Sequence, residues 1–214
     1  MKNFGLSRDV PVDQAHAALL FIDVQNYTME DGGEYAGLPR DVVLQRHGYF
    51  FREMRTRAIP NMQRLQRVCR ERGIEVLYTV IEAQTLDGRD MGLDYKISGL
   101  FCPKGSRDAK VIDEIAPIGD EMVIPKTSSS VFISTNIHYV LTALGVRSLI
   151  IAGALTDQCV DSAVRDACDL GYLVTLPTDA CATQSEARHA NALANNRGYC
   201  RQVTTDALVA ELSA

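Results

Sequence analysis

Three residues with complementary chemistry stand at or just after the ends of apolar segments in this 214-residue chain. Asp23 lies at the end of the first such segment, Lys126 directly follows another, and Cys159 comes shortly after a third. A cysteine thiolate is a nucleophile, a carboxylate can accept and return a proton, and an ammonium group stabilises nearby negative charge. Together these groups could cleave a carbonyl compound through a covalent thioester.

Cys159 is placed where a thiol can be activated. A free thiol has a pKa near ~8.5, so it is mostly protonated at neutral pH. Residues 157–170 are predicted to form a helix, and its first turn would hold Cys159 near the positive end of the helix dipole. Lys126 close by would lower the thiol pKa further. Asp23 could take the thiol proton and pass it to a leaving nitrogen.

Each of the three residues also has an ordinary structural explanation. An aspartate at a strand end often caps or pairs, a single lysine is usually solvated, and a single cysteine is usually a buried, inert thiol. Strand-end position alone therefore leaves both explanations open for Asp23, Lys126 and Cys159.

The elements that would bring these residues together follow from the apolar pattern. Strands are predicted at 17–24, 74–81, 121–125, 147–153, 172–177 and 199–203. Helices are predicted over 41–72 with an interruption at Pro60, from Ser134 or Thr135 to Leu144, over 157–170, over 185–197, and after a cap at Thr204 or Thr205. This alternation predicts a single α/β domain with three layers, in which helices cover both faces of a parallel sheet.

The segments outside these elements predict where a ligand would bind. Residues 1–16 form an N-terminal arm, and residues 25–40 and 82–120 are predicted loops. Ligands bind outside the carboxyl ends of strands in open parallel sheets, which is where Asp23, Lys126 and Cys159 should meet.

Composition excludes several classes of function. The net charge of -5 and the absence of a Lys/Arg cluster argue against nucleic-acid binding. No apolar run approaches the length of a membrane helix, and the N-terminus has no secretory h-region, so a soluble, cytoplasmic protein is expected. Widely spaced cysteines without CxxC pairs indicate reduced thiols and disfavour structural zinc; three of them have no assigned role, namely Cys102, Cys181 and Cys200.

Several segments together resemble the isochorismatase-like cysteine hydrolase superfamily. They are LLFIDVQN (19–26), IPKTSSSVF (124–132), IIAGALTDQCVDSAVRDACDLGY (150–172) and TDACAT (178–183). The resemblance implies a six-stranded, mostly parallel sheet and a catalytic triad of Asp23, Lys126 and Cys159. It also implies a cis peptide between Ala154 and Leu155, and an oxyanion hole formed by the N–H groups of Leu155 and Cys159.

The resemblance also narrows the substrate. Isochorismatases themselves lack the cysteine. Nicotinamidases carry two metal-binding histidines after the second strand, where this chain has IEAQTLDGRD (81–90). Cofactor-free, metal-free hydrolysis of a small linear amide or ureide is therefore expected, as in biuret, triuret, ureidoacrylate or N-carbamoyl compounds. A nicotinamidase-like amidase and a non-catalytic ligand-binding member remain the alternatives. The family also implies a homodimer or homotetramer.

Five further residues are candidates for substrate binding because they follow the first two strands or the lysine: Gln25, Asn26, Glu82, Gln84 and Phe132. The polar four could hydrogen-bond a urea-like group, and Phe132 could form a wall of the pocket. Loop anchoring, a turn role and core packing are equally natural explanations for them.

Overall fold

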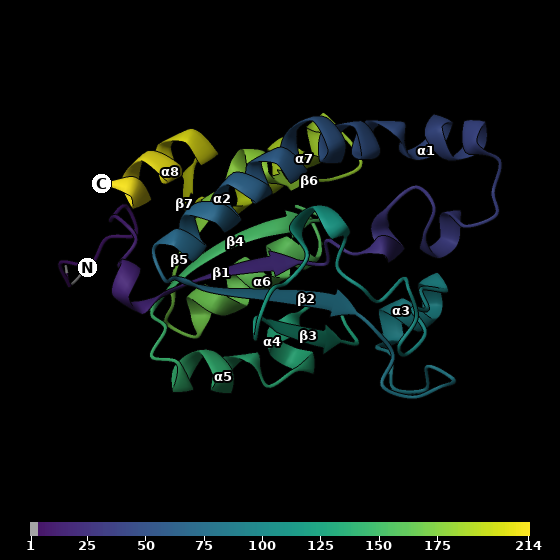
Figure 1. Cartoon of the computed structure of the whole chain (residues 1–214), viewed down its shortest axis with the longest axis horizontal. Coiled ribbons are helices and arrows are strands. Elements are labelled where there is room, and N and C mark those ends of the chain that lie inside the picture. Colours follow the sequence, from purple (N-terminus) through teal and green to yellow (C-terminus); the bar gives the residue numbers. More distant parts are fainter. Residues whose placement is uncertain (1–3) are drawn as a thin grey trace.

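The strands form one parallel sheet in the computed structural model, which describes residues 4–214 apart from the side chain at position 34 (Figure 1). Across the sheet the order is β3 (Met122–Lys126), β2 (Glu75–Ile81), β1 (Ala17–Ile22), β4 (Ser148–Ala154), β5 (Leu173–Pro177) and β7 (Arg201–Val203). The six predicted strands agree with these to within two residues. A seventh strand, β6 (Cys181–Ala182), pairs with the end of β4 and is too short to give an apolar run.

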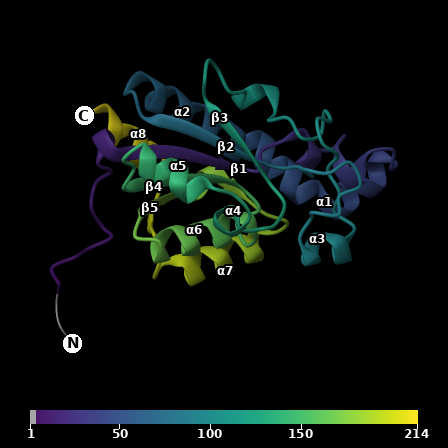
Figure 2. The same ribbon diagram turned by 90° about the horizontal axis from the view of Figure 1, so that it is seen from below.

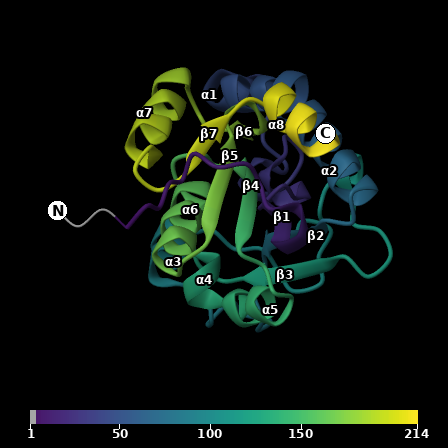
Figure 3. The same cartoon turned by 90° about the vertical axis from the view of Figure 1, so that its left-hand side faces the viewer.

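Helices cover both faces of the sheet, which is why its central strands are apolar throughout (Figures 2 and 3). All residues of β1 and β4 are buried. One face carries α1 (Arg40–Glu53), α2 (Ile59–Glu71) and α8 (Thr205–Ser213). The other carries α4 (Val131–Ser134), α5 (Ile137–Ala143) and α6 (Cys159–Asp169), with α7 (Glu186–Asn196) packed against α6.

The first long helical segment has no break at Pro60, contrary to the prediction. A π-helical turn, Met54–Ala58, joins α1 to α2, and Pro60 lies in the first turn of α2. Proline lacks an N–H group and its ring displaces the carbonyl four residues earlier, so a wider turn before it keeps the helical path continuous.

The helix predicted from Ser134 or Thr135 to Leu144 corresponds to α5, which begins at Ile137, and a separate short helix, α4, precedes it. The hydroxyl of Ser130 accepts a hydrogen bond from the N–H of Ile133 and caps α4, which ends at Ser134. The hydroxyl of Thr135 then accepts from the N–H of Ile137 at the start of α5. Two closely spaced hydroxyl acceptors thus start two short helices where one was expected.

The strand order places a switch point between β1 and β4. From β1 the chain adds β2 and β3 on one side, and β4 then returns to the other side of β1. The loop over residues 82–120 contains α3 (Leu93–Ser98), which lies beyond the carboxyl end of β2 (Figure 1). None of the helices within residues 4–214 has the length and apolar character needed to cross a bilayer.

Candidate active site

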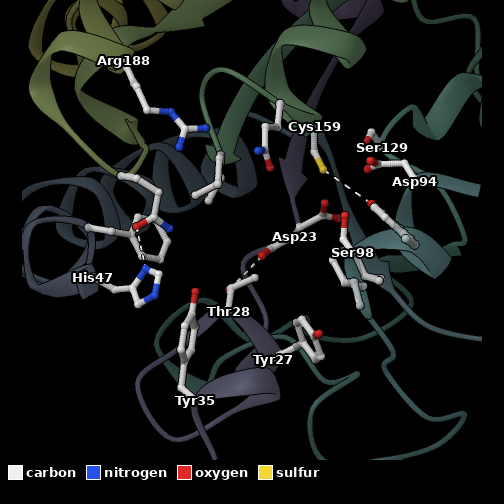
Figure 4. Close-up of a pocket in the computed structure, with 18 residues that line it drawn as sticks. Asp23, Tyr27, Thr28, Tyr35, His47, Asp94, Ser98, Ser129, Cys159 and Arg188 are labelled. Carbon is white, nitrogen blue, oxygen red and sulfur yellow. Dashed lines mark hydrogen bonds between the residues drawn. The ribbon is translucent and has the colours of Figure 1, made fainter. Parts of the chain in front are cut away.

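A cavity of about 360 Å³ lies at the carboxyl ends of β1 and β4, at the switch point of the sheet (Figure 4). Asp23 and Cys159 lie in its lining, together with Leu155 from the chain after β4. Much of the remaining wall comes from the loop after β1, from α1, from α3 and from the start of α7 with the segment before it. The irregular segments predicted to shape a ligand site therefore contribute to this cavity.

Asp23 follows β1 in a left-handed backbone conformation, with φ of 54°. Aspartate adopts this conformation more readily than most residues because its short polar side chain can bond locally. Its N–H donates to the carbonyl oxygen of Thr79 (3.1 Å), and the Thr79 hydroxyl donates to Asp23 Oδ1 (2.7 Å). The neighbouring strand β2 thus fixes the direction of the carboxylate.

Lys126 ends β3, and its ammonium group is completely buried. Nζ donates to the Tyr95 hydroxyl oxygen (2.9 Å), to the Ser128 carbonyl oxygen (2.8 Å) and to Cys159 Sγ (3.4 Å). An ammonium group has three N–H donors, and these contacts occupy all of them. Asp23 Oδ2 lies 2.9 Å from Nζ as an ion pair, and the Asp23 side chain is also hydrogen-bonded to the Cys159 thiol. The carboxylate therefore lies beside both the amine and the thiol.

The charge of Lys126 is held by its partners. Burial by itself lowers the pKa of this amine, but the charge of Asp23, followed by Cys159 and Tyr95, raises it above its ordinary value. The amine therefore stays protonated at neutral pH and acts as a fixed positive charge rather than as a base.

Cys159 is the first residue of α6, and only 7% of its surface is exposed. Burial raises the pKa of its thiol to about 11, with the charge of Asp23 acting in the same direction and Lys126 opposing it. This net direction is opposite to the predicted lowering of the thiol pKa, because burial and the charge of Asp23 outweigh the effect of Lys126. The resting thiol is protonated, so nucleophilic attack requires a base.

The structure brings all three predicted catalytic residues together and adds a fourth group. The hydroxyl of Tyr95, on α3, lies 3.7 Å from Cys159 Sγ. Sequence reasoning missed this residue because the segment around it lacks periodicity, and nothing local distinguishes its tyrosine from other aromatic residues. The only available signal was its place in a segment expected to shape the ligand site.

The predicted oxyanion hole lies in the turn between β4 and α6. The Ala154–Leu155 peptide bond is cis, as the resemblance implied. The Leu155 carbonyl oxygen accepts from the N–H groups of Gln158 (3.0 Å) and Val160 (3.2 Å), which closes the turn. The N–H groups of Leu155 and Cys159 have no acceptor within the part of the chain that the structure describes. Both residues line the cavity.

Gln25 and Asn26 were predicted to bind substrate, but neither lines the cavity. The Gln25 amide is fully buried; it donates to the carbonyl oxygens of Ile81 (3.0 Å) and Asp108 (2.9 Å) and accepts from the Ile81 N–H (2.6 Å). The Asn26 amide donates to the carbonyl oxygen of Arg107. Both side chains attach the loop 82–120 to the sheet, which is the structural alternative for them.

The other three predicted substrate-binding residues also lie outside the cavity. Glu82 accepts a hydrogen bond from the N–H of Gly105 (2.7 Å), so it anchors its loop. Gln84 is exposed, and Phe132 packs near Tyr172 with ring centroids 6.1 Å apart. Position after a strand predicted the correct edge of the sheet for these residues but not the direction of their side chains.

A polar group opposite the thiol was also missed. Arg188, in the first turn of α7, lines the cavity, and its Nε donates to Asp157 Oδ2 (2.5 Å). Beside it, Gln184 Oε1 lies 3.0 Å from His47 Nδ1 on α1, and both of these residues also line the cavity. Figure 4 shows the Arg188 and His47 side chains reaching in from the walls. The guanidinium keeps two NH₂ groups that can bind an anion.

A comparison with known families finds one match over most of the chain. Residues 17–207 match the model described as "Isochorismatase domain". This range includes every strand of the sheet, Cys159 and the three groups around its thiol, namely Asp23, Tyr95 and Lys126.

Three curated relatives illustrate the range of named functions. An N-carbamoylsarcosine amidase of an Arthrobacter species is 36% identical over 56% of this chain, which spans about half (48%) of that enzyme's length. The ureidoacrylate amidohydrolase RutB of Rhizobium rhizogenes is 27% identical over 80% of this chain and 72% of its own. A "probable inactive nicotinamidase" of Arabidopsis thaliana is 35% identical over 81% of this chain and 84% of its own.

The fold has solved counterparts. A cysteine hydrolase from Pseudomonas syringae pv. phaseolicola superposes with a TM-score of 0.78, at 21% identity and with 95% of each chain covered. At this identity the similarity establishes the fold alone.

Proposed function

This chain belongs to the isochorismatase family, and from that premise we propose that it hydrolyses a C–N bond of a small linear amide or ureide through a Cys159 thioester. The observation that supports this most is the position of Cys159 Sγ, 3.4 Å from Lys126 Nζ, which is itself 2.9 Å from Asp23 Oδ2. A nucleophile, a fixed positive charge and a proton acceptor thus adjoin one cavity.

The proposed first half-reaction uses each group once. Asp23 Oδ2 takes the thiol proton as Sγ attacks the substrate carbonyl carbon, and the carbonyl electron pair moves onto oxygen. The N–H groups of Leu155 and Cys159 hold this oxyanion. The tetrahedral intermediate collapses, the C–N bond breaks, and protonated Asp23 returns its proton to the leaving nitrogen. Lys126 keeps its proton and stabilises the thiolate as it forms.

The second half-reaction reverses these roles. Water attacks the thioester carbonyl and passes a proton to Asp23, the same N–H groups hold the second oxyanion, and the C–S bond breaks. Asp23 then returns the proton to the departing sulfur. The raised pKa of the thiol, about 11, favours this last step because it makes the resting protonated form stable.

For the substrate, we propose a ureide that carries a carboxylate. Two relatives are named for N-carbamoylsarcosine and ureidoacrylate, and each of these compounds joins a ureido group to a carboxylate. Arg188 in the cavity lining offers the two NH₂ groups that such a carboxylate can bind. Biuret and triuret have no negative group for Arg188 and are expected to be poorer substrates.

A screen of ammonia release tests the function. We expect turnover of N-carbamoylsarcosine, ureidoacrylate or an N-carbamoyl amino acid above that of biuret, triuret and nicotinamide. The Cys159→Ala variant should keep the fold and lose turnover of the best substrate. If Cys159→Ala retained wild-type turnover, the thioester mechanism would be wrong. A wild-type protein that released no ammonia from any of these compounds would favour a non-catalytic member.

A further inference from the structure

The hydroxyl of Tyr95 lies between the two groups that control the nucleophile. Its oxygen accepts a hydrogen bond from Lys126 Nζ (2.9 Å) and lies 3.7 Å from Cys159 Sγ. The side chain is buried, and Lys126 Nζ also lies 5.5 Å from the centre of its ring. Besides Asp23, the sulfur therefore has two polar neighbours, the amine and this phenol.

The direction of the Tyr95 proton follows from its partners. Because Lys126 has only donors, it must donate to the phenol oxygen, and the phenol proton has to point elsewhere. Within residues 4–214, Cys159 Sγ is the other polar atom in hydrogen-bonding contact with this hydroxyl. Burial raises the pKa of the phenol well above its ordinary value, although Lys126 opposes the shift, so the hydroxyl keeps its proton. Polarisation by the ammonium group makes it a stronger donor.

We propose that Tyr95 is a fourth catalytic residue, whose hydroxyl donates a hydrogen bond to the Cys159 sulfur and stabilises the thiolate while Asp23 holds its proton. The thiol S–H bond breaks, the proton moves to Asp23 Oδ2, and the sulfur keeps the electron pair. Tyr95 retains its own proton throughout, so it enters and leaves the cycle unchanged.

Backbone contacts around Tyr95 keep its hydroxyl close to Lys126. The N–H of Gly92, just before α3, donates to the carbonyl oxygen of Thr127, directly after the lysine (2.7 Å). A side chain at Gly92 would approach that oxygen to 3.2 Å, so the two segments meet closely. The N–H of Leu100 then donates to the Tyr95 carbonyl oxygen (2.9 Å). The backbone segments that carry the phenol and the amine are thus hydrogen-bonded directly to each other.

The test measures the reactivity of Cys159 without any substrate. Iodoacetamide alkylation can be followed between pH 7 and 9 by mass spectrometry of the tryptic peptide 148–165, in which Cys159 is the sole cysteine. Tyr95→Phe keeps the ring and removes the donor. A lost hydrogen bond to a charged group raises the thiol pKa by about one unit, which lowers the alkylation rate roughly three- to tenfold.

Two further variants distinguish a hydrogen bond from Tyr95 to the thiol from a general loss of packing. Tyr172→Phe removes another buried tyrosine hydroxyl, which bonds to His138 far from the thiol, and should leave the alkylation rate unchanged. A 3-fluorotyrosine placed at position 95 is a stronger donor and should raise the rate above wild type. A wild-type alkylation rate in Tyr95→Phe, or a fall in rate with fluorotyrosine, would overturn the proposal.

The proposal builds on the thioester mechanism, yet the two can fail separately. If the protein released no ammonia from any ureide, the proposed function would be wrong. The alkylation rates would still show whether Tyr95 stabilises the thiolate, because that assay uses no substrate. If turnover depends on Cys159 but Tyr95→Phe is alkylated at the wild-type rate, then Tyr95 has no catalytic role, while the proposed roles of Asp23, Lys126 and Cys159 still stand. With a substrate in hand, Tyr95→Phe should lower kcat more than it raises KM, because the hydrogen bond strengthens as charge develops on sulfur.

Discussion

Asp23 and Lys126 form an ion pair that is almost completely withdrawn from solvent, with exposed fractions of 1% and 0%. The cost of desolvating two such charges largely cancels their attraction, so the pair adds little net stability. In the proposed mechanism the pair serves the reaction instead: the carboxylate accepts a proton from the thiol, and the amine is a permanent positive charge.

Replacing only one residue of that ion pair should destabilise the protein. Lys126→Met leaves an uncompensated buried carboxylate and should reduce the free energy of unfolding by about 3–5 kcal/mol, as measured by urea denaturation. The double variant Asp23→Asn with Lys126→Met removes both charges and should recover most of that loss while staying inactive. A double variant as unstable as the single one would contradict this explanation.

Arg188 provides the test of substrate class. Arg188→Gln should lower kcat/KM for a carboxylate-bearing ureide roughly 10- to 100-fold and leave that for biuret nearly unchanged, because a charge-assisted bond of about 1.5–3 kcal/mol is lost only with the anion. Arg165→Gln is a matched control, since Arg165 also donates through Nε to a carboxylate, that of Asp161 (2.8 Å), but lies outside the cavity lining. Equal losses on both substrates would refute carboxylate recognition.

The sequence predicted that Asp23, Lys126 and Cys159 lie together, and the structure places them so. This could be predicted because parallel strands have their carboxyl ends at one edge of the sheet, and because several motifs resemble a family; the catalytic roles of the three residues stay a prediction. Tyr95 and Arg188 come from a short helix in an irregular loop and from the first turn of α7, where no local pattern indicates a direction. Gln25 was misassigned because a buried amide that joins loops looks the same in sequence as one that faces a ligand.

At the scale of elements, the close approach of β1 and β4 depends on Gly153. It has φ of 132°, and a Cβ built there would lie 2.2 Å from the Ile22 carbonyl oxygen. That oxygen belongs to the backbone of the paired strand and cannot move without separating β1 from β4.

Gly153→Ala should therefore destabilise the protein by roughly 4 kcal/mol or more, or prevent folding. Gly145→Ala gives the comparison: it also has positive φ (73°), but nothing lies within 4 Å of the added Cβ, so about 1–2 kcal/mol is expected. Chemical denaturation of both variants measures the difference. Similar losses would show that conformation, rather than the strand contact, determines the cost.

The boundaries of the helices and strands show which structural features could be predicted from the sequence. Buried strands were predicted to within two residues because both faces of a parallel sheet are apolar. The π turn before Pro60 and the short helix α4 were missed, because both depend on which carbonyl or hydroxyl satisfies a particular N–H group. Such choices are made by tertiary contacts that a propensity pattern does not contain.

At the scale of the whole molecule, buried thiols should govern alkaline stability. Burial raises the pKa from 9.0 to about 12 for Cys69 and Cys181 and to about 11 for Cys102, Cys159 and Cys200. Above pH 9 the unfolded chain releases these protons while the folded protein retains them, so the free energy of unfolding should fall between pH 9 and 11–12. Urea midpoints measured from pH 8 to 11 check this, and a flat profile would refute it.

The active site draws on strands from both sides of the switch point, and this has a consequence for biosynthesis. Asp23 and Lys126 leave the ribosome before Cys159, and each residue of β4 pairs with a residue of β1 that is 131 positions earlier, for example Ser148 with Ala17. A nascent chain therefore carries an acid and an amine without a nucleophile until α6 has emerged. If the proposed mechanism holds, the three groups are first complete when β4 has paired with β1.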